Sequence, residues 1–263
     1  KPVQPVGEPT VAVAVPQLRP SELLIGGRYR RAGKILDGRF STLYKGKDEK
    51  TGLPVSIRHL ESYSHINAAA GQPTDEARAQ TLREGRLLSK LVHPSLPRVR
   101  QLVQDGYDVY LVGDALPEHT LKAEVSENGA YEPELVRRYL IQLLRVVNYL
   151  HSQEHPIIHR DLRAETILAS EHGSLCLAEF GLAKIEESSS VKATTSFRSA
   201  GDPHFAAPEQ LMGDTSSVKN DLYSVGALAY FLATGKPPAE SLKRFAGASL
   251  MEPLPPELDP KIR

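Results

Sequence analysis

The sequence predicts an α+β protein with a β-rich N-terminal half that contains one helix, followed by an α-rich half. Short runs of β-favouring residues, separated by turn residues, succeed one another between residues 29 and 112. Apolar residues at helical spacing then dominate two long stretches between residues 136 and 234. No internal repeat is present, so the two halves are expected to be different units.

Each element of the β-rich half has a local signal. The expected strands include residues 35–36, 42–44, 55–57 and 109–112. Thr74 or Asp75 can cap the single helix of this half, and its leucines at 82, 88 and 91 fall close to one face. That helix is expected to end before Pro94, because the residue before a proline disfavours the α conformation.

The second half is mostly helical. One helix is expected through residues 136–150 and another through 218–234, where Gly235 and the following prolines end it. Short strands are expected around residues 167–168 and 175–177.

The first 27 residues differ from the rest of the chain. Five prolines punctuate them, which favours a Pro-rich linker or N-terminal extension. Valines at positions 11, 13 and 15 alternate with alanine, so a short strand docked on the domain is the alternative.

Composition excludes several function classes. Lys+Arg and Asp+Glu both number 32, and this zero net charge argues against nucleic-acid and membrane-surface partners. The longest apolar stretch, residues 225–233, falls far short of the roughly 20 residues that span a bilayer. Cys176 is the only cysteine, which excludes an internal disulfide. The sequence opens at Lys1 with neither an initiator Met nor the apolar region of a signal peptide, so we expect a cytoplasmic piece of a longer protein.

Four short motifs, in order, carry a resemblance to the protein kinases. Residues 157–168 resemble the catalytic loop, whose pattern is His-Arg-Asp-Leu, three variable residues and Asn. Residues 179–181, Glu-Phe-Gly, resemble the magnesium-binding Asp-Phe-Gly, and residues 201–209 resemble the segment that ends in Ala-Pro-Glu. Residues 221–226 resemble the family's helix with a buried aspartate. The order and spacing of these motifs indicate a bilobal kinase-like fold.

The resemblance implies domain boundaries. The kinase-like domain is expected over residues 28–263, with an N-lobe at about 28–113 and a C-lobe at about 117–263. The last helices of the C-lobe, and the arginine that normally pairs with Glu209, are not visible in the sequence.

The resemblance also implies site residues. Residues 35–45 align with the Gly-rich strand-turn-strand, and Gly113 stands where a larger gatekeeper is usual. The implied nucleotide-binding positions are Gly38, Arg58, Glu84, Asp114, Leu116 and Leu168. Gly113 leaves extra space behind the hinge unless bulky neighbours fill it.

The phosphate and metal positions depart from the kinase pattern. Leu36 and Ser41 replace two of the three glycines, and Arg58 replaces the phosphate-pairing lysine with a wide planar fork. A structural pairing of Arg58 with Glu84 is favoured over a catalytic one. The metal positions carry Glu179, a longer carboxylate, and Thr166, a poorer ligand for magnesium than Asn, so both are expected to be vestigial.

The catalytic loop is better preserved. Asp161, the usual base, remains, with Arg163 where Ser/Thr kinases carry a lysine. Asp202 replaces a threonine that faces the base, and its charge is expected to repel Asp161. The resemblance implies that His159 packs under Phe180 and that Asp221 holds the backbone of the loop. An architectural reason for keeping the loop therefore competes with a chemical one.

Further packing and regulatory features follow from the resemblance. Leu88, His159 and Phe180 are expected to stack in one spine. Leu43, Ser56 and Leu168 are expected to form a second spine, which flanks the adenine in kinases. The Ser/Thr-rich segment 182–204 is expected to be a solvated loop, with phosphorylation that pairs with Arg160 as the alternative.

These observations favour a pseudokinase that acts as a protein-interaction scaffold and needs no cofactor, since ATP and magnesium binding are expected to be weak or absent. The alternatives are a weakly active Ser/Thr kinase that uses Glu179 and Asp161, and a nucleotide sensor that needs no metal. The Pro-rich leader and the degraded site are similar to the kinase-like domains of giant muscle proteins such as titin, twitchin and obscurin. That similarity implies a sarcomeric location and cytoskeletal or signalling proteins as partners.

Overall fold

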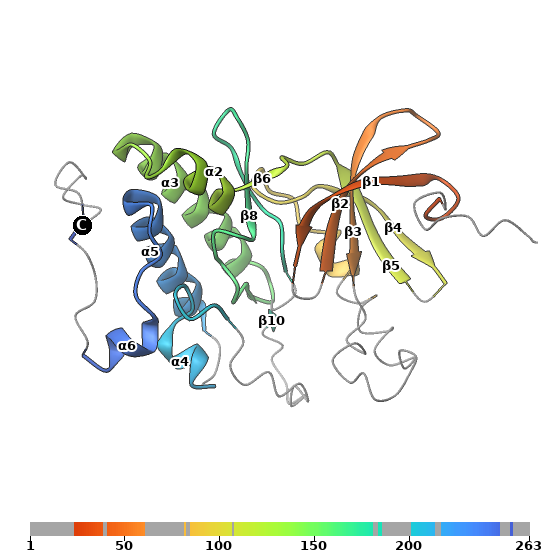
Figure 1. Ribbon diagram of the computed structural model, residues 1–263. Helices are drawn as coiled ribbons and strands as arrows, with labels where there is room; N and C mark the ends of the chain where they lie inside the picture. Colours follow the sequence, from red (N-terminus) through yellow and green to blue (C-terminus); the bar gives the residue numbers. More distant parts are fainter. Residues whose placement is uncertain are drawn as a thin grey trace, which may run out of the picture.

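The computed structural model describes residues 24–38, 41–60, 82, 85–106, 108–180, 184–185, 201–213, 217–247 and 253–254. A β-sheet forms one lobe and helices dominate the other, with the sheet on the right and the helices on the left of Figure 1. The α+β, bilobal architecture that the sequence predicts is therefore confirmed.

The N-lobe is built on a five-stranded antiparallel sheet in the order β1-β2-β3-β5-β4. Its strands are β1 (Tyr29–Asp37), β2 (Ser41–Asp48), β3 (Pro54–Leu60), β4 (Val99–Asp105) and β5 (Asp108–Asp114). The inner strands supply fully buried side chains such as Ile57 and Val109. Ile25, inside the predicted leader, is also buried against this sheet, and the valines at 11, 13 and 15 lie outside the described residues.

The helix expected between β3 and β4 is described only at Leu82 and residues 85–88, all of which are helical. Leu82 and Leu88 pack against Leu60, Val109 and Leu111 of the sheet. The chain leaves the helix before His93, as the sequence predicts.

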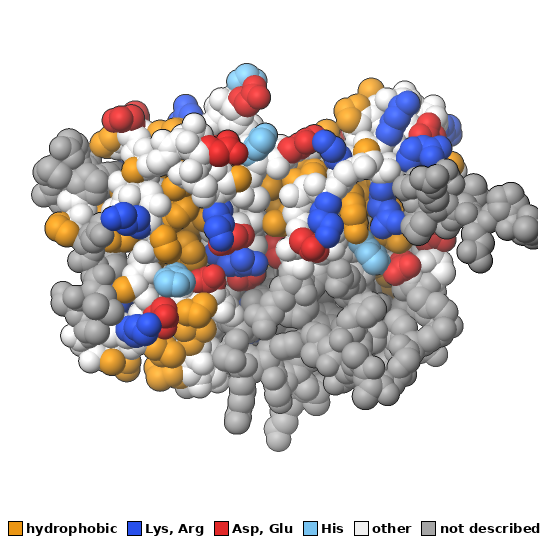
Figure 2. All heavy atoms as spheres, in the orientation of Figure 1, with side chains coloured by type: hydrophobic (Ala, Val, Ile, Leu, Met, Phe, Trp, Pro, Cys, Tyr) orange, Lys and Arg blue, Asp and Glu red, His pale blue; other side chains and the backbone are white. Residues whose placement is uncertain are grey.

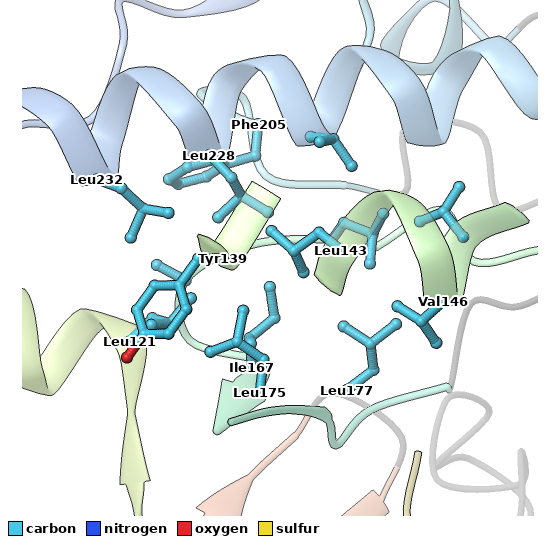
Figure 3. Packing of buried hydrophobic residues seen from close by; sticks show 14 of the residues in the cluster. Leu121, Tyr139, Leu143, Val146, Ile167, Leu175, Leu177, Phe205, Leu228 and Leu232 are labelled. Carbon is cyan, nitrogen blue, oxygen red and sulfur yellow. The ribbon is translucent and has the colours of Figure 1, made fainter. Parts of the chain in front are cut away.

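Three helices organise the C-lobe: α2 (Leu121–Asn128), α3 (Pro133–His151) and α5 (Val218–Thr234). Ser217 and Asn220 form a reciprocal capping box at the start of α5, and Gly235 ends it in the left-handed conformation (φ 71°). Figure 3 shows Leu228 and Leu232 of α5 facing the side of α3 that carries Leu143. Side chains as fully buried as these contribute roughly 1.5–3 kcal/mol each.

Short elements connect the large ones. They are β6 (His119–Thr120), β7 (Ile157–Ile158), β8 (Ile167–Ala169), β9 (Leu175–Leu177), β10 (Lys184–Ile185), α4 (Pro208–Leu211) and α6 (Ser241–Phe245). β6, β8 and β9 form one small sheet, and β7 pairs with β10 in another. These strands place the predicted catalytic loop between β7 and β8, facing the N-lobe sheet.

The visible surface mixes acidic and basic side chains over both lobes, in keeping with the balanced composition (Figure 2). Among the described residues, no helix is both long and apolar enough to cross a membrane.

Candidate functional site

The turn between β1 and β2 approaches the C-lobe at Gly38. The Gly38 amide donates to the Ser41 carbonyl at 2.9 Å, which closes the turn. A Cβ atom on Gly38 would lie 1.6 Å from the Glu179 carboxylate oxygen Oε2, so any larger residue would collide with that carboxylate. The close approach therefore requires glycine at position 38.

Ser41 and Glu179 form a direct bridge between the lobes. The Ser41 hydroxyl lies 3.1 Å from each carboxylate oxygen of Glu179, to which it donates, and the Phe180 amide donates to Oε1 at 3.1 Å. Ser41 is 3% exposed and Glu179 is 2% exposed. Both residues replace the kinase pattern, Ser41 a glycine and Glu179 an aspartate, and here the two replacements satisfy each other.

Arg58 on β3 is buried beside this bridge. Burial lowers the pKa of its guanidinium, and the nearby Glu179 charge acts in the opposite direction. Its Cζ lies 5.9 Å from the centre of the Phe180 ring, and its Nη2 has no hydrogen-bond partner in the described part of the chain. Glu84, its predicted partner, lies outside the described residues, so that pairing stays a prediction.

The two leucines among the predicted adenine-flanking residues belong to one apolar cluster between the lobes, and Ser56 is not a member of it. Leu43 of β2 and Leu168 of β8 are 2% and 0% exposed, and Leu116 packs against the same cluster. Cys176 is part of it, and burial raises the pKa of its thiol to about 12, which leaves the thiol protonated and unreactive. Protein atoms alone bury both leucines that the resemblance assigns to the adenine position.

Two ion pairs lie at or near the hinge, residues 112–116. Asp114 pairs with Arg100 at 2.7 Å, and this guanidinium lowers the pKa of the Asp114 carboxyl. Lys45 on β2 pairs with Glu118, just before β6, at 2.8 Å. The Lys45–Glu118 pair is a second link between the lobes, exposed to solvent and hence weaker than the buried bridge.

The structure gives a steric reason for glycine at position 113 that the sequence did not reveal. A Cβ atom there would lie 2.4 Å from the Arg98 carbonyl oxygen, which accepts a hydrogen bond from the Asp114 amide. The cavity that Gly113 helps to line has a volume of about 20 Å³, enough for about one water molecule. Neighbouring residues therefore fill most of the extra space that was expected behind the hinge because Gly113 lacks a side chain.

The catalytic-loop residues are held by one another. Arg163 Nε lies 3.1 Å from Asp161 Oδ1, and its Nη1 lies 3.7 Å from Glu165. The Thr166 hydroxyl lies 3.0 Å from the carbonyl oxygens of both Asp161 and Arg163, and Thr166 is fully buried. Thr166 therefore serves the conformation of the loop.

Asp221 anchors the same loop from α5. It accepts hydrogen bonds from the backbone amides of His159 and Arg160, each at 2.8 Å, and lies 2.8 Å from His151 Nε2. These bonds hold Arg160 at a positive φ of 68°, which is strained for a residue with a side chain. The resemblance implied this role for Asp221.

His159 and Phe180 form the packing contact that the resemblance implies. Their ring centroids lie 4.9 Å apart, and Leu88 joins the same core cluster as Phe180. His159 Nδ1 accepts from the Asp161 amide, and burial lowers the pKa of the imidazole. His159 is thus a neutral core side chain.

Two further residues have local partners. The Asp202 carboxylate accepts from the His204 amide at 2.8 Å, so it stabilises its own turn. Glu209, whose usual arginine is not visible in the sequence, accepts from Asn220 Nδ2 at 3.0 Å. The serines and threonines between residues 186 and 200 lie outside the described residues, and so does any phosphorylation there.

Sequence reasoning missed the partners of three site residues. It identified Ser41, Glu179 and Thr166 as departures but did not pair Ser41 with Glu179 or assign Thr166 to the loop backbone. The only available signal was the location of two replacements. Ser41 lies in the Gly-rich turn and Glu179 in the Asp-Phe-Gly position, and in kinases these two motifs meet around the same phosphates. Within the described ranges, no three His, Cys, Asp or Glu side chains gather in a group that could hold a metal ion.

Comparisons with known proteins identify the family. The chain is 30% identical over 234 residues to a probable serine/threonine-protein kinase of Dictyostelium discoideum, covering 88% of this chain and 44% of that protein. It is 30% identical over 239 residues to serine/threonine-protein kinase B of Synechocystis (87% and 40%). It is 29% identical over 212 residues to mitogen-activated protein kinase kinase kinase 2 of Arabidopsis thaliana (80% and 32%).

The chain thus spans less than half the length of each of these relatives. The family model described as the protein kinase domain matches residues 29–251, which include both lobes and every motif discussed above. The chain belongs to the protein kinase domain family.

Proposed function

We propose that this kinase-fold chain is a pseudokinase, a protein-binding scaffold with little or no magnesium-ATP-dependent phosphotransfer. The observation that carries the proposal is the bridge between Ser41 and Glu179. It places the carboxylate at the metal-ligand position directly under the β1–β2 turn, where a kinase covers the phosphates. A triphosphate and this carboxylate would compete for the same space with the same sign of charge.

The available donors do not fit a magnesium–triphosphate in this arrangement. Both Glu179 oxygens accept from Ser41, and the Thr166 hydroxyl is committed to loop carbonyls. Arg58 is 4% exposed, and its buried guanidinium lies against Phe180, with one nitrogen unbonded in the described region. Rearranging the site for the nucleotide would break the buried bridge, at a cost of about 1–3 kcal/mol.

The opposite end of the cleft supports the same proposal. The leucines that would flank an adenine are already buried in a shared cluster, so a base would have to separate them first. Packing of this kind holds the two lobes together without nucleotide, as a scaffold requires.

A second candidate, a weakly active Ser/Thr kinase, is favoured by one observation. Asp161 is retained and lies within hydrogen-bond reach of Arg163, the position at which Ser/Thr kinases steady the phosphate. The relatives named above are called kinases, and their activity is consistent with this candidate.

The proposal includes proteins as partners and a cytoplasmic location. A sarcomeric location and cytoskeletal partners remain predictions from the similarity to giant muscle proteins. Most of the leader that suggested them lies outside the described residues.

A thermal-shift titration with ATP, with and without Mg²⁺ or Mn²⁺, tests the proposal when it is paired with a phosphotransfer assay. We expect no metal-dependent shift and no phosphate transfer to a generic Ser/Thr peptide. Phosphate transfer that the wild type catalyses and the Asp161→Asn variant does not would contradict the scaffold proposal. It would support the weakly active Ser/Thr kinase instead. A shift that needs no metal would instead support a nucleotide sensor.

A further inference from the structure

A basic depression lies on the C-lobe and shares no lining residue with the cleft between the lobes. It has a volume of about 400 Å³ and is formed by α3 and the turn between β8 and β9. The lining residues of α3 occupy positions 134, 137, 138, 141, 142 and 145, a spacing that places them on one helical face.

The charges that line this depression are unbalanced. Three arginines face it, Arg137, Arg138 and Arg145, against one lining carboxylate, Glu134. Glu134 binds Arg137 through two hydrogen bonds of 2.6 and 3.0 Å, which neutralises that arginine. Arg138 and Arg145 form no ion pair with any described residue, and His172 adds a further polar ring from the turn.

The walls of the depression are tied together. Gln142 on α3 donates from Nε2 to the Gly173 carbonyl and accepts at Oε1 from the Leu175 amide, both at 3.0 Å. Gly173 has a φ of 74°, and a Cβ atom there would lie 1.7 Å from Arg138 Nη2, so the guanidinium rests on the turn backbone. A site with prearranged walls loses less entropy when it binds a ligand.

The spacing of Arg138 and Arg145, which have no ion-pair partner in the described part of the chain, selects the ligand. Arg145 lies seven positions after Arg138 on the same helix, which places their Cα atoms about 10 Å apart. Residues three apart in an extended peptide span a similar distance, about 10 Å. Guanidinium groups bind carboxylates and phosphates through paired hydrogen bonds. A single small anion would engage only one arginine, whereas an acidic peptide would engage both.

We infer that this depression is a docking site for an acidic segment of a protein partner, with Arg138 and Arg145 as its anchors. The site does not depend on the state of the cleft, so it would serve a scaffold and a working kinase equally.

Fluorescence anisotropy with the full 263-residue chain tests the inference. The probe is a fluorescein-labelled Gly/Ser peptide with two glutamates three residues apart, and its control is the same peptide with glutamine at both positions. We expect binding of the glutamate peptide only, and weaker binding at higher salt because the site is exposed. Arg138→Glu with Arg145→Glu should weaken binding at least about ten-fold, because both contacts become repulsive.

Lys219→Glu, at an exposed position of α5, is the control and should bind as the wild type does. If the double reversal lowers the melting temperature, Arg138→Gln with Arg145→Gln replaces it; a smaller loss of affinity is then expected, because the attraction is removed without added repulsion. Equal binding of both peptides, no binding at all, or unchanged affinity in the neutral double variant would overturn the inference. An oligonucleotide or anionic vesicle that binds through these arginines when the peptide does not would also overturn it.

Discussion

The Ser41 hydroxyl donates to both carboxylate oxygens of Glu179, each at 3.1 Å, and so joins two residues that lie 138 positions apart. The bridge connects Ser41, at the start of β2, to Glu179, which lies two residues after the end of β9. Both residues are buried, which excludes water from the bridge. Both partners are therefore expected to depend on each other for stability, because a buried carboxylate that loses a donor is costly.

Replacement of Ser41 by alanine tests that dependence. We expect Ser41→Ala to lower the free energy of unfolding in urea by about 1–2 kcal/mol, because the Glu179 carboxylate stays buried with one donor fewer. Ser89→Ala is the control, since its hydroxyl donates to the Arg86 carbonyl near the surface. A loss for Ser41→Ala no larger than that for Ser89→Ala would show that the bridge adds little.

Restoring the kinase residues at both ends of the bridge should partly reopen the phosphate region. Ser41→Gly with Glu179→Asp removes the donor and shortens the carboxylate. The Kd for magnesium-ATP, measured by calorimetry, is expected to fall at least about ten-fold, or about 1.4 kcal/mol. Ser41→Gly with Glu179→Gln keeps the longer side chain without its charge and should not acquire magnesium dependence. If the first variant binds no better than the wild type, the bridge is not what limits binding.

The buried imidazole of His159 makes stability depend on pH. Burial holds its pKa in the folded protein below the usual 6.5, so between these two values the unfolded chain binds a proton that the native protein does not. The free energy of unfolding should therefore fall as the pH drops below about 6.5, by at most about 1.4 kcal/mol per pH unit for one proton.

His159→Phe keeps a ring against Phe180 and should remove this part of the pH dependence. Denaturant unfolding at a series of pH values, for the wild type and the variant, isolates the contribution because all other titrating groups are shared. Parallel pH profiles would contradict the assignment of a neutral, buried His159.

Two glycine-to-alanine substitutions should change the free energy of unfolding in opposite directions. Gly113→Ala would place a Cβ atom 2.4 Å from the Arg98 carbonyl, and we expect a loss of about 1–3 kcal/mol from the strain. Gly226→Ala lies inside α5 with nothing within 4 Å of the new Cβ, and it should gain about 0.4–1 kcal/mol. Thermal melts of both variants check the pair, and a tolerated Gly113→Ala would mean that the strand next to it can move.

Local patterns predicted the large elements well. The helix expected through residues 136–150 is Pro133–His151, and the one expected over 218–234 has these bounds because Ser217 and Gly235 punctuate it. α2 was not predicted, since only Leu121 and Val125 of its side chains are buried and the apolar pattern is too sparse. Short α4 and α6 have too few residues to show any period.

The candidate site was predictable in its members but not in its partners. The motifs located Arg58, Asp161 and Glu179, because the resemblance fixes their positions along the chain. Whether Glu179 binds a metal or a serine depends on how closely the β1–β2 turn approaches the C-lobe. That approach is determined by packing between residues that are distant in sequence, such as Leu43 and Leu168. Gly113 illustrates the same difficulty, because the Arg98 carbonyl that excludes a side chain is brought there only by the pairing of β4 with β5.

The Lys45–Glu118 pair and the buried bridge fasten the cleft at its rim and at its base, using only groups that the polypeptide itself supplies. Both contacts form when the chain folds, and neither includes a nucleotide atom. Under the proposed scaffold function, a partner that touches both lobes at once would meet the same surface at any ATP concentration.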